Sequence, residues 1–287
     1  MTSSLLTAEN QHVEVNGAQI AYREIGSAAG VPLVLLSRFR ASIDDWDPQV
    51  IDRLAAERRV IVFDNTGIGF SGGDVQPTVR RMSEVAIGFV EALGLSEIDL
   101  LGFSMGGFVA QRFTLTRPDL VRHLVLVGTG AGGGEGAVAP TSDNLPYMAA
   151  PQASTEGFQA LFFTPDEVGR KASQTYWDNI HNTRRLPESD VQLEAAKVQL
   201  GAIAAYAGGD DATLPELEQI KQPVLVVNGN DDTMVPTPNS YLLAQKIPNA
   251  ELILYPHSGH GSLFQYPETF TRDVLTFLRA QEDGGLR

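Results

Sequence analysis

Ser104 lies at the centre of a GxSxG sequence that begins at Gly102 and ends at Gly106. An apolar run at 98–101 predicts a strand before it, and apolar residues at helical spacing in 108–113 predict a helix after it. In so tight a turn, side chains larger than hydrogen at the two glycine positions would collide with the backbone. The turn also places the serine hydroxyl beside a helix N-terminus, where backbone N–H groups favour developing negative charge. We therefore predict that Ser104 is a nucleophile.

A serine nucleophile needs a general base, and histidine is the commonest one. His260 lies between two glycines on a loop beyond an apolar run that ends near Leu254, so its ring can reach the same end of the sheet as Ser104. His257 directly follows a proline and is expected to pack within that loop. Surface or structural roles are expected for the remaining histidines, which are His12, His123 and His181. The sequence thus predicts His260 as the base.

The histidine in turn needs a carboxylate, which fixes its tautomer and stabilises the imidazolium ion. Asp231 and Asp232 are adjacent acids that follow the apolar run 224–227, at the carboxyl end of a predicted strand. One of them is also expected to cap the turn before Pro236. With either acid, the chain order of the three groups is serine, acid, histidine.

Short apolar runs alternate with helical patterns along most of the chain. Strands are predicted at 12–15, 20–24, 32–36, 60–63, 98–101, 124–127, 223–228 and 251–254. Helices are predicted near 48–56, 79–93, 238–246 and 267–280, besides the one after Ser104. This alternation favours a mostly parallel sheet covered by helices on both faces, with an antiparallel start at the Asn16-Gly17 turn.

The alternation stops within residues 130–215, where large side chains occur in helical stretches and no convincing strand is found. These stretches lie near 157–162, 165–179 and 190–206. We therefore predict a core domain, made of residues 1–129 and 216–287, and a helical cap at 130–215 that covers one end of the sheet.

Glycines 128, 130 and 133 match the GxGxxG spacing of dinucleotide-binding loops. However, further glycines and Pro140 follow, so no helix can open directly after the motif. The tract is better explained as a hinge between sheet and cap, and no cofactor is expected.

The composition limits the classes of function. The chain has 287 residues and a net charge of −14, which disfavours binding to nucleic acids and to anionic membranes. Neither a signal-like start nor a run of membrane-spanning length is evident, so a cytoplasmic location is expected. The lack of cysteine excludes disulfides, thiolate metal sites and a cysteine nucleophile. The oligomeric state stays open between monomer and homodimer.

Together these motifs resemble the α/β-hydrolase fold superfamily, and the resemblance covers nearly the whole chain outside the cap. The family's GxxDxxVP motif matches 229–236 and implies that Asp232, not Asp231, is the catalytic acid. The family's histidine falls on His260, and a family DxRGxGxS segment is matched at 64–71. The resemblance implies an eight-stranded, mostly parallel sheet and a Ser104–His260–Asp232 triad that needs neither metal nor cofactor.

The sequence departs from the family pattern at two places, and the first concerns the oxyanion hole. Ser37 and Arg38 replace the usual His-Gly pair, and by position the oxyanion donors become the backbone N–H groups of Phe39 and Met105. The arginine of the DxRG segment is Thr66 here. We hypothesise that Arg38 restores the missing positive charge, and its alternative role is to bind an acidic group of the substrate.

The cap carries many aromatic side chains, which suggests a mostly apolar small-molecule substrate. Phe163 and Trp177 are the predicted cap residues of its pocket. A serine nucleophile suits an acyl substrate, so we expect a carboxylesterase or lactonase. The alternatives are hydrolysis of a carbon–carbon bond next to a ketone, a perhydrolase-like side activity, and a ligand receptor that keeps the triad but has little turnover.

Overall fold

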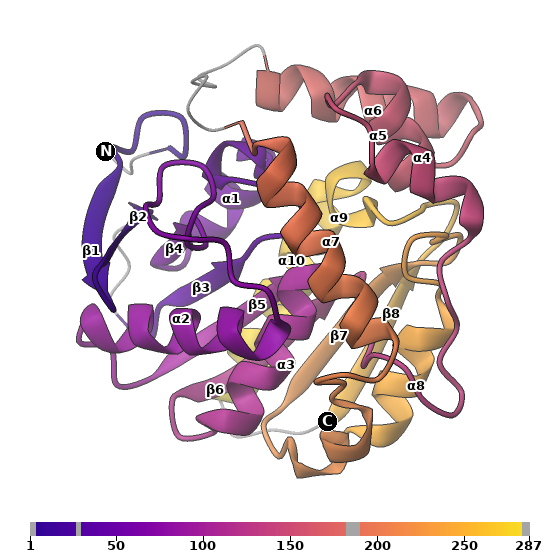
Figure 1. Cartoon of the computed structure of the whole chain (residues 1–287). Coiled ribbons are helices and arrows are strands. Elements are labelled where there is room, and N and C mark those ends of the chain that lie inside the picture. Colours follow the sequence, from indigo (N-terminus) through magenta and orange to yellow (C-terminus); the bar gives the residue numbers. More distant parts are fainter. Residues whose placement is uncertain (1–3, 27–29, 182–189, 283–287) are drawn as a thin grey trace.

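Eight strands form one twisted sheet in the order β1-β2-β4-β3-β5-β6-β7-β8 (Figure 1), in a computed structural model that describes residues 4–26, 30–181 and 190–282. The strands are β1 (Gln11–Val15), β2 (Ala18–Ile25), β3 (Leu33–Leu36), β4 (Val60–Phe63), β5 (Ile98–Phe103), β6 (Val121–Val127), β7 (Val224–Gly229) and β8 (Ala250–Tyr255). β2 runs antiparallel to both β1 and β4, and every other neighbouring pair is parallel. The predicted α/β-hydrolase architecture with its eight-stranded, mostly parallel sheet is therefore confirmed.

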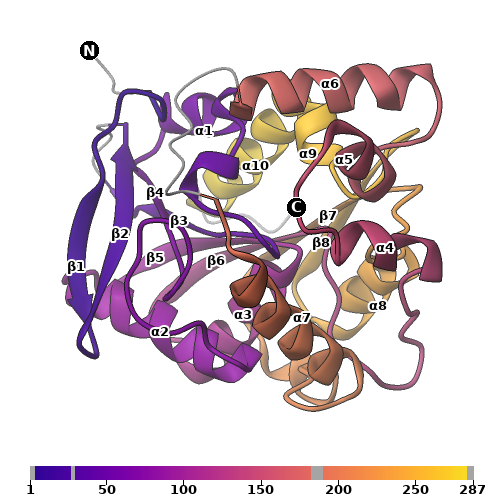
Figure 2. The ribbon, with the colours of Figure 1, turned by 45° about the horizontal axis from the view of Figure 1, so that its top comes forward.

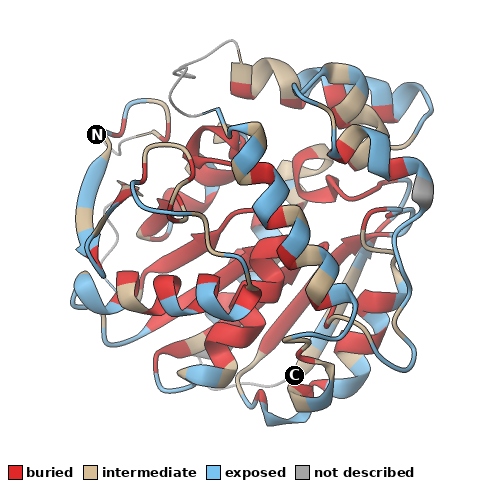
Figure 3. Ribbon diagram, in the orientation of Figure 1, coloured by how far each residue is buried: buried red, intermediate tan, exposed pale blue. Residues whose placement is uncertain are grey.

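The central strands are buried on both faces, as parallel sheets require. β3, β4 and β5 have no residue that is exposed or even half-buried, whereas β1 at the edge is mostly exposed (Figure 3). This explains why the central strands appear in the sequence as continuous apolar runs.

Helices cover both faces of the sheet (Figures 1 and 2). The helices of the sheet domain are α1 (Pro48–Ala55), α2 (Val79–Ala92), α3 (Met105–Thr116), α8 (Pro238–Lys246), α9 (Ser262–Gln265) and α10 (Pro267–Glu282). α1, α9 and α10 pack into one apolar layer, and α2, α3 and α8 pack into the other. α1 begins as expected, because the side chain of Asp47 accepts a hydrogen bond from the backbone N–H of Gln49 and proline occupies the first helical position.

The segment predicted as the cap contains helices α4 (Leu145–Met148), α5 (Thr155–Phe162), α6 (Glu167–His181) and α7 (Leu193–Ala207). α4 was not predicted, because it is a single short turn without an apolar period. In Figure 2, α4, α5 and α6 lie together at one end of the sheet. α7 instead runs down to the sheet domain, where Tyr206 stacks on Phe108 of α3 at 4.5 Å. The division into a core at 1–129 and 216–287 and a cap at 130–215 stays a prediction.

Among the described residues, no helix is both long enough and apolar enough to cross a membrane.

Candidate active site

Ser104 occupies a strained turn between β5 and α3, as the sequence predicts. Its backbone φ is 56° and its ψ is −119°, a conformation that residues other than glycine rarely adopt. The backbone N–H of Ser104 donates to the carbonyl of Val127, and its own carbonyl accepts from the Thr129 hydroxyl. The strand end and the neighbouring β6 loop therefore hold the strained conformation in place.

The two motif glycines are required by close backbone approach. A Cβ on Gly106 would overlap the carbonyl group of Leu36 at the end of β3, and a Cβ on Gly102 would overlap the backbone of Gly106. The glycines thus let the first turn of α3 lie directly against β3 and β5. That contact aims Ser104 out of the carboxyl end of the sheet.

His260 and Asp232 form a buried pair next to this turn. The Nδ1 atom of His260 lies 2.8 Å from Oδ2 of Asp232, and the side chains of both residues are at most 1% exposed. The other carboxylate oxygen of Asp232 accepts the backbone N–H groups of Met234 and Val235. Because Asp232 faces Nδ1, the Nε2 atom of His260 is left for proton exchange with a serine or substrate.

The structure also distinguishes Asp232 from its neighbour Asp231, and His260 from the nearby His257. Asp231 and His257 are exposed, whereas Asp232 and His260 are buried. The histidine loop approaches β7 closely, because a Cβ on Gly229 would overlap the backbone carbonyls of Ser258 and Gly259. Gly229 therefore lets the loop that carries Asp232 and the loop that carries His260 lie close together.

The predicted oxyanion donors belong to two segments, the loop after β3 and the first turn of α3. Met105 is the first residue of α3, so its N–H belongs to the group of free donors at a helix N-terminus. Phe39 lies on the loop after β3 and lines the same cavity as Ser104. The oxyanion hole stays a prediction, and it involves only the backbone N–H groups of these two residues, not their side chains.

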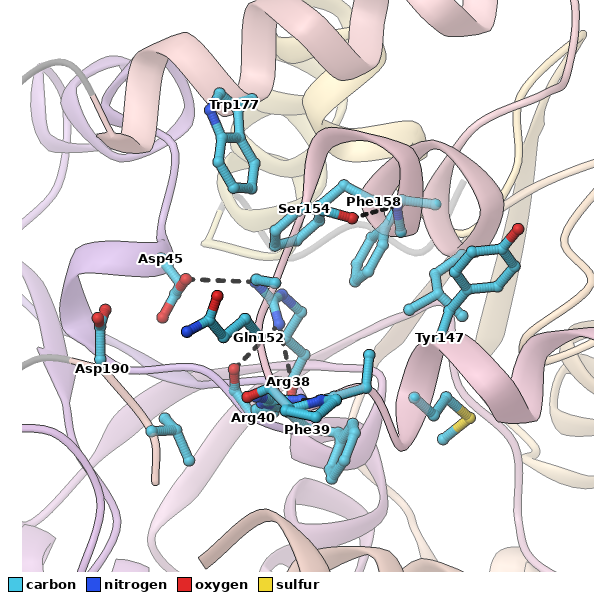
Figure 4. A pocket seen from close by; sticks show the side chains of 18 of the residues that line it. Arg38, Phe39, Arg40, Asp45, Tyr147, Gln152, Ser154, Phe158, Trp177 and Asp190 are labelled. Atoms are coloured by element: carbon cyan, nitrogen blue, oxygen red, sulfur yellow. Dashed lines mark hydrogen bonds and ion pairs between the residues drawn. The ribbon is translucent and has the colours of Figure 1, made fainter. Parts of the chain in front are cut away.

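A cavity of about 700 Å³ lies between the sheet end and the helices α4, α5 and α6 (Figure 4). Ser104 and His260 both line it. Its aromatic and other large apolar lining side chains are Phe39, Tyr147, Met148, Phe158, Leu161, Phe162, Trp177, Leu193 and Met234. A volume of this size accommodates a small organic molecule.

Of the two predicted cap residues, Trp177 lines the cavity and Phe163 is not among its lining residues. α5 ends at Phe162, and Phe163 follows it in extended backbone, with φ −129° and ψ 161°. Phe163 is buried near Tyr176 and Gly261, and Phe162 takes the predicted place. A shift of one residue at the helix end decides which ring faces the substrate space.

Arg38 lines the cavity, and so does Arg40, for which no role is predicted from the sequence. Arg40 has a left-handed backbone, with φ 53°, and its guanidinium donates to the carbonyls of Ala150 and Pro151. It thereby ties the loop after β3 to the loop that joins α4 and α5. The only feature of the sequence that could have pointed to Arg40 is its place two residues after Arg38, because alternate residues of an extended loop point to the same side.

The hypothesis that Arg38 replaces the arginine missing at position 66 finds no direct contact in its favour among the described residues. The polar contacts of Arg38 run to Asp45, to Tyr176 and to backbone carbonyls. Asp64, the acid of the matched DxRG segment, instead accepts the backbone N–H groups of Ile43 and Phe70, at 2.7 and 2.9 Å.

Asp64 is fully buried, and burial, reinforced by the charges of Asp44 and Asp45, raises its pKa to about 7. In the unfolded chain its pKa is near 4. Between these values the native state binds more protons than the unfolded state, so this group makes the free energy of unfolding fall as pH rises from about 4 to 7.

We therefore expect the free energy of unfolding of the wild type, minus that of Asp64→Asn, to decrease by about 2–3 kcal/mol between pH 5 and pH 8. Asparagine keeps an oxygen acceptor at this site but does not titrate, so the titrating groups that are not coupled to Asp64 cancel in the difference. Urea denaturation of both proteins at the two pH values measures it. Parallel pH profiles would show that the Asp64 pKa is not raised.

Comparison with known proteins agrees with the fold. A family model described as the alpha/beta hydrolase fold matches residues 31–267. The solved structure of an alpha/beta hydrolase fold protein from Chitinophaga pinensis is 34% identical, covers 96% of this chain and 99% of its own, and has a TM-score of 0.86.

Two curated relatives have named activities. A Pseudomonas savastanoi protein provisionally named carbamate hydrolase RutD is 27% identical over 258 residues, which are 88% of this chain and 96% of its own. The poly(3-hydroxyalkanoate) depolymerase of Ectopseudomonas oleovorans is 29% identical over 256 residues, which are 87% of this chain and 85% of its own. Since the family model spans most of the chain and the observed sheet has the same architecture, the protein belongs to the α/β hydrolase fold family.

Proposed function

We propose that this protein is a serine hydrolase that cleaves a carboxylic ester or lactone of a small, mostly apolar substrate. Ser104 is the nucleophile, His260 the general base and acid, and Asp232 the carboxylate that orients His260. The observation that carries the proposal is the 2.8 Å contact between His260 Nδ1 and Asp232 Oδ2 beside the cavity onto which the strained Ser104 opens. The relatives named as a carbamate hydrolase and as a depolymerase support hydrolysis as the class of reaction.

In the proposed cycle, Ser104 Oγ attacks the carbonyl carbon of the substrate while His260 Nε2 accepts its proton. The negative charge that forms on the carbonyl oxygen is stabilised by the N–H groups of Phe39 and Met105, each worth roughly 3 kcal/mol. The carbon–oxygen bond then breaks, and His260 protonates the leaving alcohol. Water, deprotonated by His260, attacks the acyl-enzyme and releases the acid together with free Ser104.

The size and lining of the cavity support the substrate class. A volume of about 700 Å³ lined by aromatic rings fits an apolar acyl or alkyl group better than a polymer chain or a large polar ligand. Ester and lactone substrates share the same tetrahedral intermediate, so the proposed machinery serves both.

The proposal is tested by intact mass after treatment with a generic phosphonate that labels activated serines. A single adduct on the wild type, absent from both Ser104→Ala and His260→Ala, is the expected result, followed by turnover of members of an ester and lactone panel. A folded wild type that forms no adduct would contradict the proposal. In that case a ligand that raises the melting temperature without being consumed would support the receptor alternative.

If substrate is turned over, identification of the products shows whether a carbon–carbon or a carbon–oxygen bond is cleaved.

A further inference from the structure

Arg38 places a buried positive charge immediately before one of the proposed oxyanion donors. It follows β3 directly after Ser37, precedes Phe39 in the chain, and is only 6% exposed. It lines the same cavity as Ser104 and His260. A group bound by Arg38 in this cavity would lie in the substrate space, because the second hollow that Arg38 lines, beside Trp46 and Phe264, has no room for a ligand.

Most of the guanidinium N–H groups are already used by the protein, but one is not. Nη1 donates to the carbonyl oxygens of Phe39 and Arg40, at 3.0 and 3.3 Å, and Nη2 donates to the Tyr176 hydroxyl at 3.2 Å. Nε is buried and has no hydrogen-bond partner within the described ranges of the chain. A buried donor without an acceptor is costly, and its presence calls for an explanation.

The positive charge of Arg38 is also only partly compensated. Its carboxylate neighbour Asp45 lies 3.5 Å from Nη2, which is longer than a close charge-assisted hydrogen bond. The second oxygen of Asp45 accepts from the backbone N–H and the hydroxyl of Ser42. Asp190 also lines the cavity, but it acts on Arg40, whose pKa is lowered by burial and by the charge of Arg38.

Two aromatic rings keep the guanidinium in place. The Cζ atom of Arg38 lies 5.2 Å from the ring centroid of Phe158 and 5.0 Å from that of Phe162. Figure 4 shows Arg38 between Asp45 and the rings of α5. Cation–π contacts and hydrogen bonds thus fix the group, so little ordering is required when it binds an acceptor.

We propose that Arg38 binds a carboxylate of the substrate, so that the protein prefers an ester or lactone whose acyl part carries a monoanionic carboxylate. A carboxylate in the cavity would offset the partly compensated charge of the guanidinium, whereas a neutral oxygen would not. This assignment rests on the proposed hydrolase function and specifies its substrate class. The apolar walls then hold the carbon chain between the carboxylate and the reacting carbonyl.

The test compares two substrates that differ only at the far end of the acyl chain, p-nitrophenyl hydrogen glutarate with its free carboxylate and the corresponding methyl ester. We expect the wild type to have a kcat/KM at least tenfold higher for the anionic ester at low salt. Arg38→Met should lower this ratio tenfold or more, chiefly through KM, and Arg38→Lys should retain part of it. Arg272→Met changes the net charge equally at a 66% exposed side chain of α10 and should leave the ratio unchanged.

Other outcomes would overturn the assignment. If Arg38→Met lowered turnover of both esters by the same factor, Arg38 would serve only to hold its loop. A wild type that prefers the methyl ester would exclude an anionic substrate even if the variant did not fold.

A binding measurement separates this proposal from the proposed catalytic function. Calorimetry on Ser104→Ala should show monomethyl glutarate binding at least tenfold more tightly than dimethyl glutarate, and this preference should be lost when Arg38→Met is added. Equal affinities would overturn the Arg38 assignment whether or not the wild type turns over esters. Absence of turnover with the preference intact would overturn the hydrolase function alone.

Discussion

Replacing Ser104 by alanine is expected to lower kcat for ester hydrolysis by about 10⁵-fold, because the proposed acyl-enzyme can then no longer form. Loss of His260 should cost a similar factor, since the hydroxyl then has no base. Asp232→Asn should cost about 10⁴-fold, because an amide favours the wrong tautomer of His260. Because the three groups act as a unit, the triple variant should be little slower than Ser104→Ala. Steady-state kinetics on the best ester of the panel measures all four.

The chain supplies a matched control for each of these changes. Asp231 and His257 are the exposed neighbours of the proposed acid and base, and Ser96 is an exposed serine just before β5. Asp231→Asn, His257→Asn and Ser96→Ala should each keep kcat within about threefold of the wild type. A large loss in Asp231→Asn with a small loss in Asp232→Asn would reverse the assignment of the acid.

Gly106→Ala is expected to destabilise the fold by about 3 kcal/mol or more and to abolish activity. The added Cβ would overlap the carbonyl group of Leu36, and backbone of a central strand cannot move aside as a flexible side chain can. To relieve the overlap, the first turn of α3 must move away from β3, which displaces both Ser104 and the N–H of Met105. Urea denaturation measures the loss of stability, and phosphonate labelling of the residual folded fraction measures the loss of the site.

Gly201 provides the opposite case for the same substitution. It lies within α7, is exposed, and an added Cβ would meet no atom within 4 Å. Gly201→Ala should therefore raise the free energy of unfolding by about 0.5–1 kcal/mol, since alanine loses less backbone entropy than glycine in a helix. Similar effects of the two substitutions would mean that Gly106 is not held by close approach to β3.

The elements that carry the site could be predicted because their signals are local. The central strands are continuous apolar runs, the Gly102 and Gly106 positions tolerate only hydrogen, and Pro48 with Asp47 marks a helix start. Each of these features is decided by neighbours in the chain or by burial on both faces of a strand. The GxSxG spacing and the apolar runs therefore revealed these elements, although the contact that excludes a side chain at Gly106 is with Leu36, distant in the chain.

The lining of the cavity depends on contacts that are distant in the chain. Phe162 and Phe163 are adjacent and chemically identical, and only the end of α5 against the histidine loop decides which of them faces the cavity. Arg40 reaches carbonyls more than 100 positions away, at Ala150 and Pro151. No periodicity in the sequence encodes such partners.

The sequence by itself determined the class of fold, the strained serine turn, and an acid and a histidine on loops at the same end of the sheet. The tertiary structure decided that Asp232 faces His260 and that one N–H of the buried Arg38 is left without an acceptor. The physical reason is that backbone geometry follows from short-range sterics and burial, whereas the direction and partners of a loop side chain depend on which segments pack around it.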